Sequence, residues 1–449
     1  MEQPIVVEAL AHLHSLLETN DLDGAIALIE SLRPPDQADV FAELPTEQQQ
    51  ELLPQIGLED AADILEKMEE AEAAELAEGL DVSTLAPILD EMRPDEAADL
   101  LGDLLPDRVT AALAQMSEPE EVQPLLLHPD ETAGGLMTSE FLALRPRMTA
   151  AQAIKAIRSW APEVETAYYL FAVDREGALC GVVGLRQLIV ADPFSTVHEI
   201  MDPDVIFVPA DADQEECARL MSRYDLLALP VVDERDHLLG VITVDDLVEV
   251  LEEEATEDIQ RLGGAEPLDR PYLDSGVLSV AWKRLGWLAL LFITGTLTGS
   301  VLRYFQRELD MMVALAFFVP LLIGTGGNAG SQTTSTIIRA LAMGEIGFGD
   351  ALRILWHELR TGIILGVMMS VITFVRALTW GASTTLALAV AISIYAIVIW
   401  ANGLGSLLPL LAARLGIDPT IVSGPVMSTL VDATGLFIYF TIAKLVLGI

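Results

Sequence analysis

The sequence predicts a multidomain membrane protein in which an acidic soluble part precedes a five-helix transmembrane α bundle. Charge is divided unevenly along the chain. Residues 1–280 hold 15 Lys/Arg against 61 Asp/Glu, whereas residues 281–449 hold ten against seven, within a total net charge of −43. Uncharged runs of 15 residues or more occur in the second part alone. Short helical segments and a repeated α/β pattern fill the first part.

The acidic surplus argues against nucleic acid as a partner, because phosphates would be repelled and no basic stripe is present to release counterions. Cations are the expected partners, and the alternative is a solvated acidic surface that keeps the domain soluble. Cys180 and Cys217 show no metal-ligand spacing, so neither a disulfide framework nor a cysteine metal site is predicted. Met1-Glu2-Gln3-Pro4 has no basic or apolar leader pattern. We therefore expect the soluble part to stay in the cytosol.

Residues 1–132 are predicted to form an acidic helical repeat N-domain. Apolar residues recur at helical spacing from Ala9 to Met116, in short segments broken by prolines. The segments Leu58 to Leu65 and Pro94 to Leu101 resemble one another. This similarity indicates stacked short helices of the solenoid type.

Residues 133–198 and 199–254 form a second internal repeat. Leu136-Met137-Thr138 is echoed by Ile200-Met201-Asp202, and Gly181-Val182-Val183 is echoed by Gly240-Val241-Ile242. Each copy contains a strand, a turn and a second strand that leads into a helix, which predicts two α/β units side by side. The pattern resembles a tandem pair of CBS domains. That resemblance makes ATP or an ion a candidate ligand, and a dimerisation platform with an empty cleft is the alternative.

Residues 245–275 are predicted to form a connecting helix and a linker that contains Gly and Pro. The helix is crowded with acids: Asp245, Asp246, Glu249, Glu253, Glu254, Glu257 and Asp258. Residues three and four apart are neighbours on a helix, so these like charges repel one another. The segment therefore calls for a counterion.

Residues 281–449 are predicted to cross the membrane five times. The hydrophobic runs are Leu285–Leu302, Met311–Ile338, Thr361–Val375, Ala377–Ala413 and Pro419–Ala443. Their lengths suit a bilayer, and the fourth is long enough to include an exposed turn around Thr379 to Thr385. Lys and Arg near the run ends are more frequent on the side of the soluble part, six against four. We expect cytoplasmic N-terminal domains and a C-terminus outside.

Two features of the membrane half predict chemistry. Asp432 is predicted to be the only acid in the interior of a span, where a charge costs about 2.5–3.5 kcal/mol on insertion scales. Gly324-Thr325-Gly326-Gly327-Asn328-Ala329-Gly330 is predicted to unwind the second span and to expose backbone carbonyls, as Ser423-Gly424-Pro425 is in the last span. The alternative for the glycines is close packing of helices through small residues.

The order of these parts, together with four short motifs, resembles the MgtE family of magnesium channels across essentially the whole chain. The motifs are Thr243-Val244-Asp245-Asp246, Glu254-Ala255-Thr256-Glu257-Asp258-Ile259, Gly324-Thr325-Gly326-Gly327-Asn328 and Asp432-Ala433-Thr434-Gly435. The resemblance implies a homodimer whose ion pathway lies on its two-fold axis. Two copies of Asp432 would then face one another, with Gly324, Gly327 and Asn328 as further pore residues around a hydrated Mg²⁺ ion.

The resemblance also implies that Mg²⁺ bound between the cytosolic domains closes the pore. The implied regulatory ligands are Asp95 and Asp99 with Asp246 and Glu249; Asp213, Glu215 and Asp225 with Glu254, Glu257 and Asp258; and Asp418 between the last two spans. Without the ions, these like charges are expected to repel and to draw the connecting plug helices off the pore.

The predicted function is a Mg²⁺-selective channel for Mg²⁺ uptake, surrounded by lipid in the cell (inner) membrane. One alternative is a secondary transporter of Mg²⁺ coupled to Na⁺ or H⁺, and another is a membrane ion sensor that conducts nothing. Ser331 and Gly424 stand where the family commonly has Asn, so selectivity among divalent cations stays open. No enzyme is predicted, since the chain has six His and no Ser/His/Asp set or nucleotide-cleaving loop.

Overall fold

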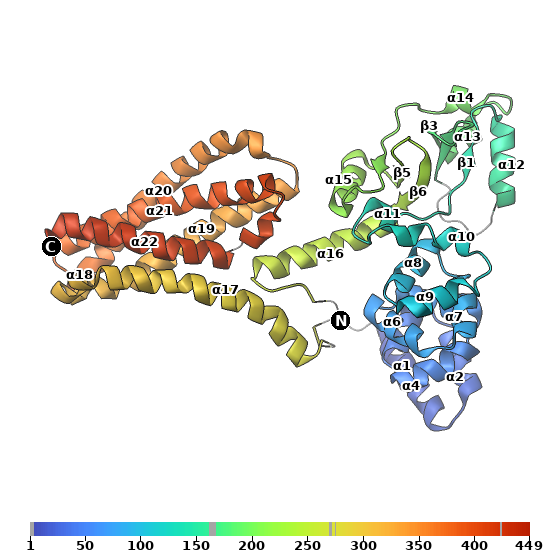
Figure 1. Ribbon diagram of the computed structural model, residues 1–449, viewed down its shortest axis with the longest axis horizontal. Coiled ribbons are helices and arrows are strands. Elements are labelled where there is room, and N and C mark those ends of the chain that lie inside the picture. Colours follow the sequence, from blue (N-terminus) through green and yellow to red (C-terminus); the bar gives the residue numbers. More distant parts are fainter. Residues whose placement is uncertain (1–3, 161–167, 269–271, 274, 423) are drawn as a thin grey trace. The chain divides into compact units, whose positions relative to one another are not determined.

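The computed structural model describes residues 1–449 except residues 1–3, 161–167, 269–271, 274 and 423. The chain divides into two compact units, Met1–Glu252 and Glu253–Ile449. Helix α16 (Val244–Leu262) begins in the first unit and continues into the second. The first unit contains a helical array and two small sheets, and the second contains five long apolar helices (Figure 1). The predicted fold class is confirmed.

Short helices follow one another at a constant interval at the start of the chain. They are α1 (Pro4–Glu18), α2 (Leu22–Ile29), α3 (Pro34–Ala42), α4 (Thr46–Leu52), α5 (Leu58–Lys67), α6 (Glu70–Gly79), α7 (Val82–Leu89), α8 (Pro94–Gly102), α9 (Pro106–Leu113) and α10 (Pro119–Val122). From α2 to α9, successive helices begin twelve residues apart. The predicted resemblance between α5 and α8 therefore spans three such intervals. Helix α3 packs on α5, α5 on α7, and α6 on α8, so each helix contacts the second one after it.

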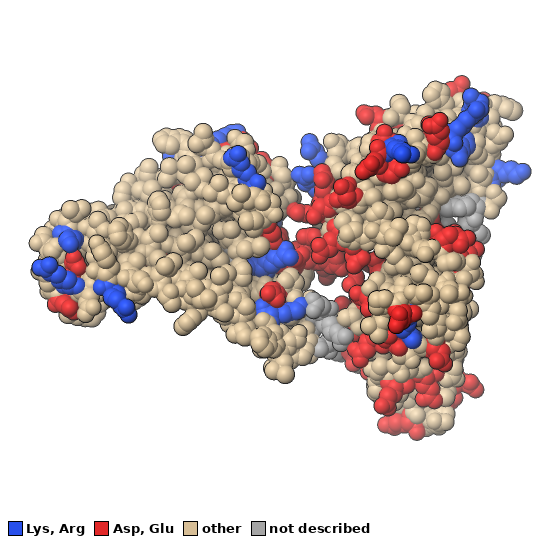
Figure 2. Space-filling model, viewed as in Figure 1, with Lys and Arg blue, Asp and Glu red and all other residues tan. Residues whose placement is uncertain are grey.

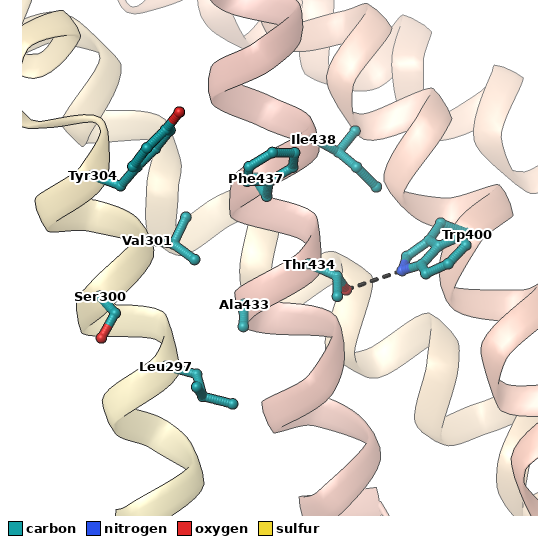
Figure 3. Close-up of a pocket in the computed structure, with 9 residues that line it drawn as sticks. All are labelled: Leu297, Ser300, Val301, Tyr304, Trp400, Ala433, Thr434, Phe437 and Ile438. Atoms are coloured by element: carbon teal, nitrogen blue, oxygen red, sulfur yellow. Dashed lines mark hydrogen bonds between the residues drawn. The ribbon is translucent and has the colours of Figure 1, made fainter.

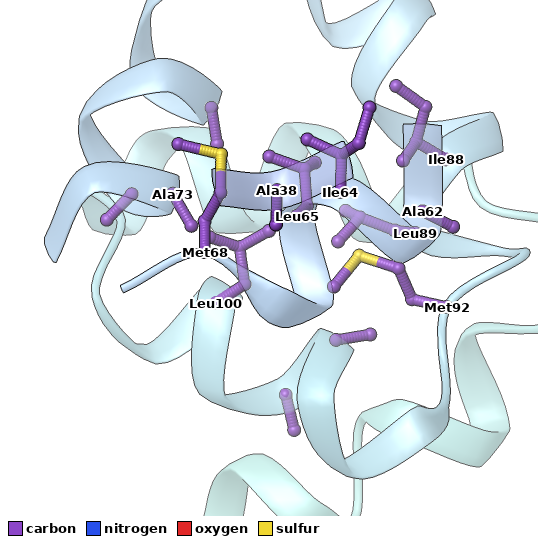
Figure 4. Close-up of a cluster of buried hydrophobic side chains, with 14 of the residues drawn as sticks. Ala38, Ala62, Ile64, Leu65, Met68, Ala73, Ile88, Leu89, Met92 and Leu100 are labelled. Carbon is purple, nitrogen blue, oxygen red and sulfur yellow. The ribbon is translucent and has the colours of Figure 1, made fainter. Parts of the chain in front are cut away.

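The inner faces of these helices form one apolar core. Ile64 of α5, Leu89 of α7 and Leu100 of α8 are buried together with small residues such as Ala38 and Ala73 (Figure 4). The alanines leave room for the larger side chains, which lets the short helices approach closely. Burial of this stripe stabilises helices that are too short to be stable alone.

Several acids of the array are bound within it rather than free at its surface. Glu30 accepts a hydrogen bond from the backbone N–H of Gly57 at 3.1 Å, and Glu66, Glu78 and Asp90 accept equivalent bonds 27 residues further along, from Arg93, Leu105 and Ser117. Gly57, Arg93 and Leu105 are the N-cap residues of α5, α8 and α9. Each carboxylate therefore satisfies a backbone donor that a helix start leaves unpaired.

Two three-stranded sheets follow the array, preceded by α11 (Ala133–Leu136). The first contains β1 (Ala143–Leu144), β2 (Tyr169–Val173) and β3 (Leu179–Gly184), with α12 (Ala150–Trp160), α13 (Leu185–Val190) and α14 (Val197–Ile200). The second contains β4 (Val208–Pro209), β5 (Ala228–Val232) and β6 (Leu238–Thr243), with α15 (Gln214–Tyr224) and the start of α16. In both sheets the first strand is parallel to the second, and the second is antiparallel to the third.

The repeated Leu/Ile-Met-polar tripeptides link the two sheets to one another. Thr138, which precedes the first sheet, pairs with Val241 of β6, and Asp202, which precedes the second, pairs with Val182 of β3. The adjacent methionines explain the repeated glycines. A Cβ atom added at Gly181 would lie 2.5 Å from the Sδ atom of Met201, and one at Gly240 would lie 2.7 Å from Met137. Each sheet is thus completed by the segment that precedes the other.

Within its described residues, the second unit contains five helices long and apolar enough to cross a membrane, as predicted. They are α17 (Val277–Tyr304), α19 (Val319–Ala342), α20 (Ala351–Thr379), α21 (Thr384–Arg414) and α22 (Gly424–Leu447); the short elements are α18 (Gln306–Met311), η3 (Val313–Phe318), η4 (Phe348–Asp350) and η5 (Pro419–Val422). The predicted turn near Thr379 to Thr385 is confirmed between α20 and α21. Helices α19 to α22 pack together, and α17 packs along α22 with none of its residues buried. Charged side chains gather toward the two ends of this unit (Figure 2).

The Asp90 bonds give a test of the array. Asp90→Ala removes acceptors from the backbone N–H groups of Ser117 and Glu118, and we expect a loss of about 1–2 kcal/mol of stability. Pulse proteolysis of the purified chain in urea measures this loss, and Glu91→Ala, at an adjacent exposed position, is the control. Equal stability of the two variants would contradict the capping role.

Candidate functional site in the membrane helices and acidic clusters

Asp432 lies on the third turn of α22, in the N-terminal half of that helix. Its side chain is half-buried, whereas the preceding Val431 is fully buried against α19. Within the described part of the chain, no hydrogen bond or ion pair reaches the Asp432 carboxylate. A charge at this depth needs a cation, water or another polar partner. The carboxylate is therefore available to a ligand from outside a single chain.

The glycine-rich stretch does not unwind, which corrects the prediction of exposed carbonyls. Helix α19 is continuous from Val319 to Ala342, so the carbonyls of Gly324 and Gly327 stay within the helical pattern. The glycines instead allow close packing. A Cβ atom added at Gly326 would lie 2.5 Å from Ile397 Cγ2, and one added at Gly330 would lie 2.8 Å from Met427. Close helix packing through small residues is the correct interpretation.

The predicted pore residues of α19 fall on two faces of the helix. Gly327 is buried, and an added Cβ there would meet Ser428 Oγ at 2.8 Å. Gly324 and Asn328, four residues apart, are exposed on the other face. Gly327 therefore acts in packing against α22, and Asn328 is the one of the three with a side chain that could contact an ion.

Ser331 and Gly424, the two departures from the family pattern, are in contact. The Ser331 hydroxyl donates to the Gly424 carbonyl at 3.1 Å and so joins α19 to the first residue of α22. The predicted last span, Pro419–Ala443, contains the 3₁₀ turn η5 and then the helix α22, which begins at Gly424. Ser423, the first residue of the predicted break, lies outside the described residues.

A groove of about 730 Å³ runs beside the Asp432 motif, between α17, α21 and α22. Its walls are mostly apolar: Leu297 and Val301 of α17 lie on the side of α22 that carries Phe437, and Ile438 points toward Trp400 of α21 (Figure 3). Thr434 of the motif accepts a hydrogen bond at 2.9 Å from the indole Nε1–H of Trp400. The threonine thus ties α22 to α21. A groove with these walls offers no set of ligands for a hydrated cation.

Glu358 is a second acid inside a span, which corrects the prediction that Asp432 is the only one. It lies in the candidate span Phe348–Thr379, with 16% of its side chain exposed. Thr333 Oγ1 lies 3.4 Å from Glu358 Oε2 and 3.0 Å from Asn402 Oδ1. The Thr333 hydroxyl has one proton, so it cannot donate to both Glu358 and Asn402. The Nδ2 atom of Asn402 has no hydrogen-bond partner in this orientation of the amide. With the amide group turned over, Asn402 donates to Thr333 and Thr333 donates to Glu358.

This polar chain joins α21, α19 and α20. The sequence contained a signal for it, because Glu358 lies four residues from both Ile354 and Gly362 on the buried stripe of α20. The predicted third span begins at Thr361, where the uncharged run begins, and it therefore excludes Glu358.

In the first unit, two basic residues hold the predicted ligands Asp95, Asp246 and Glu249. Arg93 Nη1 lies 3.8 Å from Asp95 Oδ2 and 3.6 Å from Asp246 Oδ1. Lys67 Nζ lies 3.6 Å from Glu249 Oε1. Burial, with repulsion from Asp95, raises the pKa of Asp246 to about 6. The structure therefore brings α8 and the start of α16 together, as expected.

Asp99 is the least compensated acid of this group. Burial, followed by repulsion from Glu96, Asp130, Asp95 and Glu70, raises the pKa of Asp99 to about 8. Asp95 is 5% exposed, and its Oδ1 atom has no hydrogen-bond partner within the described residues. These features suit a bound cation. No three Asp, Glu, His or Cys side chains among the described residues converge to hold a metal ion directly.

The predicted ligands on the second CBS-like unit lie at the two ends of α15. Asp213 is the N-cap of that helix and accepts from the backbone N–H of Glu215, whereas Asp225 is its C-cap in the left-handed conformation, with φ of 53°. Eleven helical residues lie between the caps, which are therefore about 18 Å apart along the helix. The three acids therefore do not form one site by themselves.

In the second unit, Arg261 connects the end of α16 to the loop before α22. Its Nη1 atom lies 2.6 Å from Asp418 Oδ2, and its Nη2 atom contacts Glu257. Burial, followed by repulsion from Asp418 and Glu254, raises the pKa of Asp258. Glu254, Glu257, Asp258 and Asp418 thus lie in one acidic cluster around Arg261.

Family models match three parts of the chain. The model described as the MgtE intracellular N domain matches residues 32–131, a CBS domain matches residues 197–253, and the model described as a divalent cation transporter matches residues 319–442. Similar curated proteins include the magnesium transporter MgtE of Thermus thermophilus, 46% identical over 73% of this chain and 72% of that protein. The magnesium transporter MgtE of Bacillus subtilis is 36% identical over the same shares.

Solved structures resemble the soluble part. The soluble part of a magnesium transporter is 33% identical and covers 56% of this chain and 99% of its own, with a TM-score of 0.51. The cytosolic domain of the Mg²⁺ channel MgtE in complex with ATP is 37% identical and covers 54% of this chain and 99% of its own, also with a TM-score of 0.51.

The packing of α19 gives a prediction about stability. Gly326→Ala places a Cβ atom against Ile397 and Val431, so we expect a loss of about 1–3 kcal/mol from overpacking. Gly403→Ala on α21 is the matched control, because its Cβ would meet Leu359 at an ordinary 3.5 Å. Thermal unfolding of the purified chain in detergent measures both variants. Equal unfolding temperatures would mean that α19 does not need glycine at this contact.

Proposed function

Because this chain belongs to the MgtE family of divalent cation transporters, we propose that it takes up Mg²⁺ through a channel formed by its membrane helices. The family is one of transporters, not of enzymes. The observation that carries the proposal is Asp432, a carboxylate inside a membrane helix with no partner in the described part of its own chain. Mg²⁺ keeps most of its waters, so a pore that binds it through few carboxylates suits its chemistry.

The proposed channel is a homodimer in which the two Asp432 carboxylates share one hydrated ion. Asn328 is the proposed second contact, and Gly324, four residues before it, lets the ion approach the helix backbone. Gly327 supports α22 from behind. The dimer lies in the cell (inner) membrane with its acidic N-terminal domains in the cytoplasm and, from the Lys/Arg distribution, its C-terminus outside.

The cytosolic acids are proposed as the sensor that closes this channel. In the first unit, Asp95 offers a buried, unpartnered oxygen beside Asp246 and Asp99. In the second, Asp258 and Asp418 repel one another at the end of α16. Mg²⁺ bound in its hydrated form would reduce these repulsions without needing three converging ligands. Asp213, Glu215 and Asp225 are proposed as additional ligands toward Glu254 and Glu257.

ATP is proposed as a ligand of the paired CBS units. The proposal rests on their likeness in sequence and fold to a cytosolic domain crystallised with ATP. Titration of the purified chain with ATP and with AMP, followed by calorimetry, tests it. If neither nucleotide gives a heat of binding, the proposal is overturned.

The pore proposal predicts that Asp432 is required for flux. We expect Asp432→Asn, which keeps the volume and removes the charge, to lower Mg²⁺ uptake into proteoliposomes on the order of tenfold or more. Asp310→Asn, at an exposed acid of α18, is the control. Uptake equal to wild type in Asp432→Asn would overturn the pore.

The same preparation separates a channel from a coupled transporter. We expect Mg²⁺ currents in planar bilayers without any Na⁺ or H⁺ gradient. A strict dependence of flux on either gradient would favour the coupled transporter instead.

The sensor proposal predicts that Mg²⁺ protects the segment after α16. Without Mg²⁺, residues 263–276 should be cleaved by protease, and millimolar Mg²⁺ should slow the cleavage. The double variant Asp258→Asn/Asp418→Asn removes one repelling pair together with its proposed ion ligands, so we expect slower cleavage without Mg²⁺ and a weaker response to added Mg²⁺. Equal cleavage of wild type with Mg²⁺ and with EDTA would count against ion-dependent closure.

A further inference from the structure

Trp400 and Thr434 form a directed chain of hydrogen bonds between two membrane helices. The indole Nε1–H of Trp400, on α21, donates to Thr434 Oγ1, on α22, at 2.9 Å (Figure 3). The Thr434 hydroxyl in turn donates to the backbone carbonyl of Leu430, one turn earlier in α22, at 2.7 Å. Each proton thus has an acceptor, so the orientation of the hydroxyl is fixed and its free lone pair faces the indole.

This chain lies where water is scarce. Trp400 is near the middle of α21 and Thr434 is near the middle of α22, and both line the mostly apolar groove. At such positions in a membrane helix, water does not replace a lost hydrogen-bond partner. Without the Thr434 hydroxyl, the indole N–H would therefore face an apolar wall.

The hydrogen bond lies on the side of α22 opposite to Asp432. Successive residues of a helix are about 100° apart around its axis, so Asp432 and Thr434 point about 160° away from one another. The bond holds one side of the helix, and the carboxylate leaves from the other. A rotation of α22 that changed the direction of Asp432 would therefore stretch the bond to Trp400.

The other contacts of this part of α22 are apolar and do not fix its rotation as strictly. Val431 lies against the glycine notch of α19, where a Cβ atom added at Gly326 would lie 2.9 Å from Val431 Cγ1. Gly435 approaches Ile397 of α21, where an added Cβ would lie 3.5 Å from Ile397 Cγ2. Apolar contacts are non-directional and permit a small rotation, whereas a hydrogen bond weakens steeply when its angle changes.

We propose that Trp400 is a positioning residue that sets the rotation of α22 and thereby the direction in which Asp432 points. The inference rests on the proposed function, in which Asp432 binds the transported ion. Mg²⁺ demands a near-ideal octahedral shell, so its binding depends on where each carboxylate lies, whereas Ca²⁺ accepts more variable geometries. Loss of the bond therefore weakens the binding of Mg²⁺ more than that of Ca²⁺.

Uptake into proteoliposomes tests this role. Trp400→Phe removes the N–H and keeps an aromatic ring, and Thr434→Val removes the hydroxyl with little change of shape. In both variants we expect the half-saturating Mg²⁺ concentration to rise about threefold or more, while the maximal rate falls by roughly twofold or less. At a Mg²⁺ concentration that nearly saturates wild type, Ca²⁺ should halve the uptake at a lower concentration than it does in wild type.

Further variants separate the hydrogen bond from packing. If the bond is the cause, the double variant Trp400→Phe/Thr434→Val should match either single variant, because each single change already removes the bond. Thr434→Ser keeps the hydroxyl and should match wild type. Trp356→Phe, at an exposed tryptophan of α20, is the control for the exchange of rings. Additive effects of the two single changes, or wild-type uptake in both, would overturn the positioning role.

Asp432→Asn in the same preparation keeps the two proposals apart. If it abolishes uptake while Trp400→Phe and Thr434→Val match wild type, the pore stands and the positioning role alone fails. If Asp432→Asn takes up Mg²⁺ as wild type does, the channel is refuted and the positioning role falls with it. If Trp400→Phe does not fold, Thr434→Val carries the test, with Thr434→Ser as its control.

Discussion

The constraint on which this molecule depends is the cost of a carboxylate where water is scarce. An ionised acid out of water needs a donor, a cation or a proton. The chain uses different solutions in different places. Backbone amides bind the acids at the helix ends of the array, arginines bind those around α16, and a hydroxyl binds Glu358. Asp432 has none of these partners in its own described chain, and it is the acid we assign to the transported ion.

The helical array shows how one acid-rich composition serves two purposes. Glu30, Glu66 and Glu78 each bind the N-cap residue of a helix 27 residues later, so they belong to the scaffold. Asp99 is buried among other carboxylates, which raises its pKa, so its carboxylate is a candidate to bind a cation. Composition alone does not distinguish these groups, because the difference lies in which backbone N–H lies within reach.

The fold was accessible to sequence reasoning where a pattern repeats. The echo between Gly181-Val182-Val183 and Gly240-Val241-Ile242 identified two matching sheets, and uncharged runs identified five membrane helices. The consequence of Gly324 to Gly330 was not accessible, because glycine permits both an unwound segment and a tightly packed helix. Contacts with Ile397 and Met427, distant in sequence, decide between these outcomes. Arg93 was missed because its partners include Asp245, about 150 residues away.

The exchange of edge segments between the two sheets has a consequence for how the soluble part responds to a ligand. Because Thr138 pairs with Val241 of β6 and Asp202 pairs with Val182 of β3, neither sheet can loosen without unpairing a segment that leads into the other. The methionines seated over Gly181 and Gly240 enforce the same coupling through side-chain packing. The pair should therefore behave as a single thermodynamic domain with one melting transition. Energy from binding at either half would be distributed over both, so a nucleotide and an ion could influence each other without sharing a pocket.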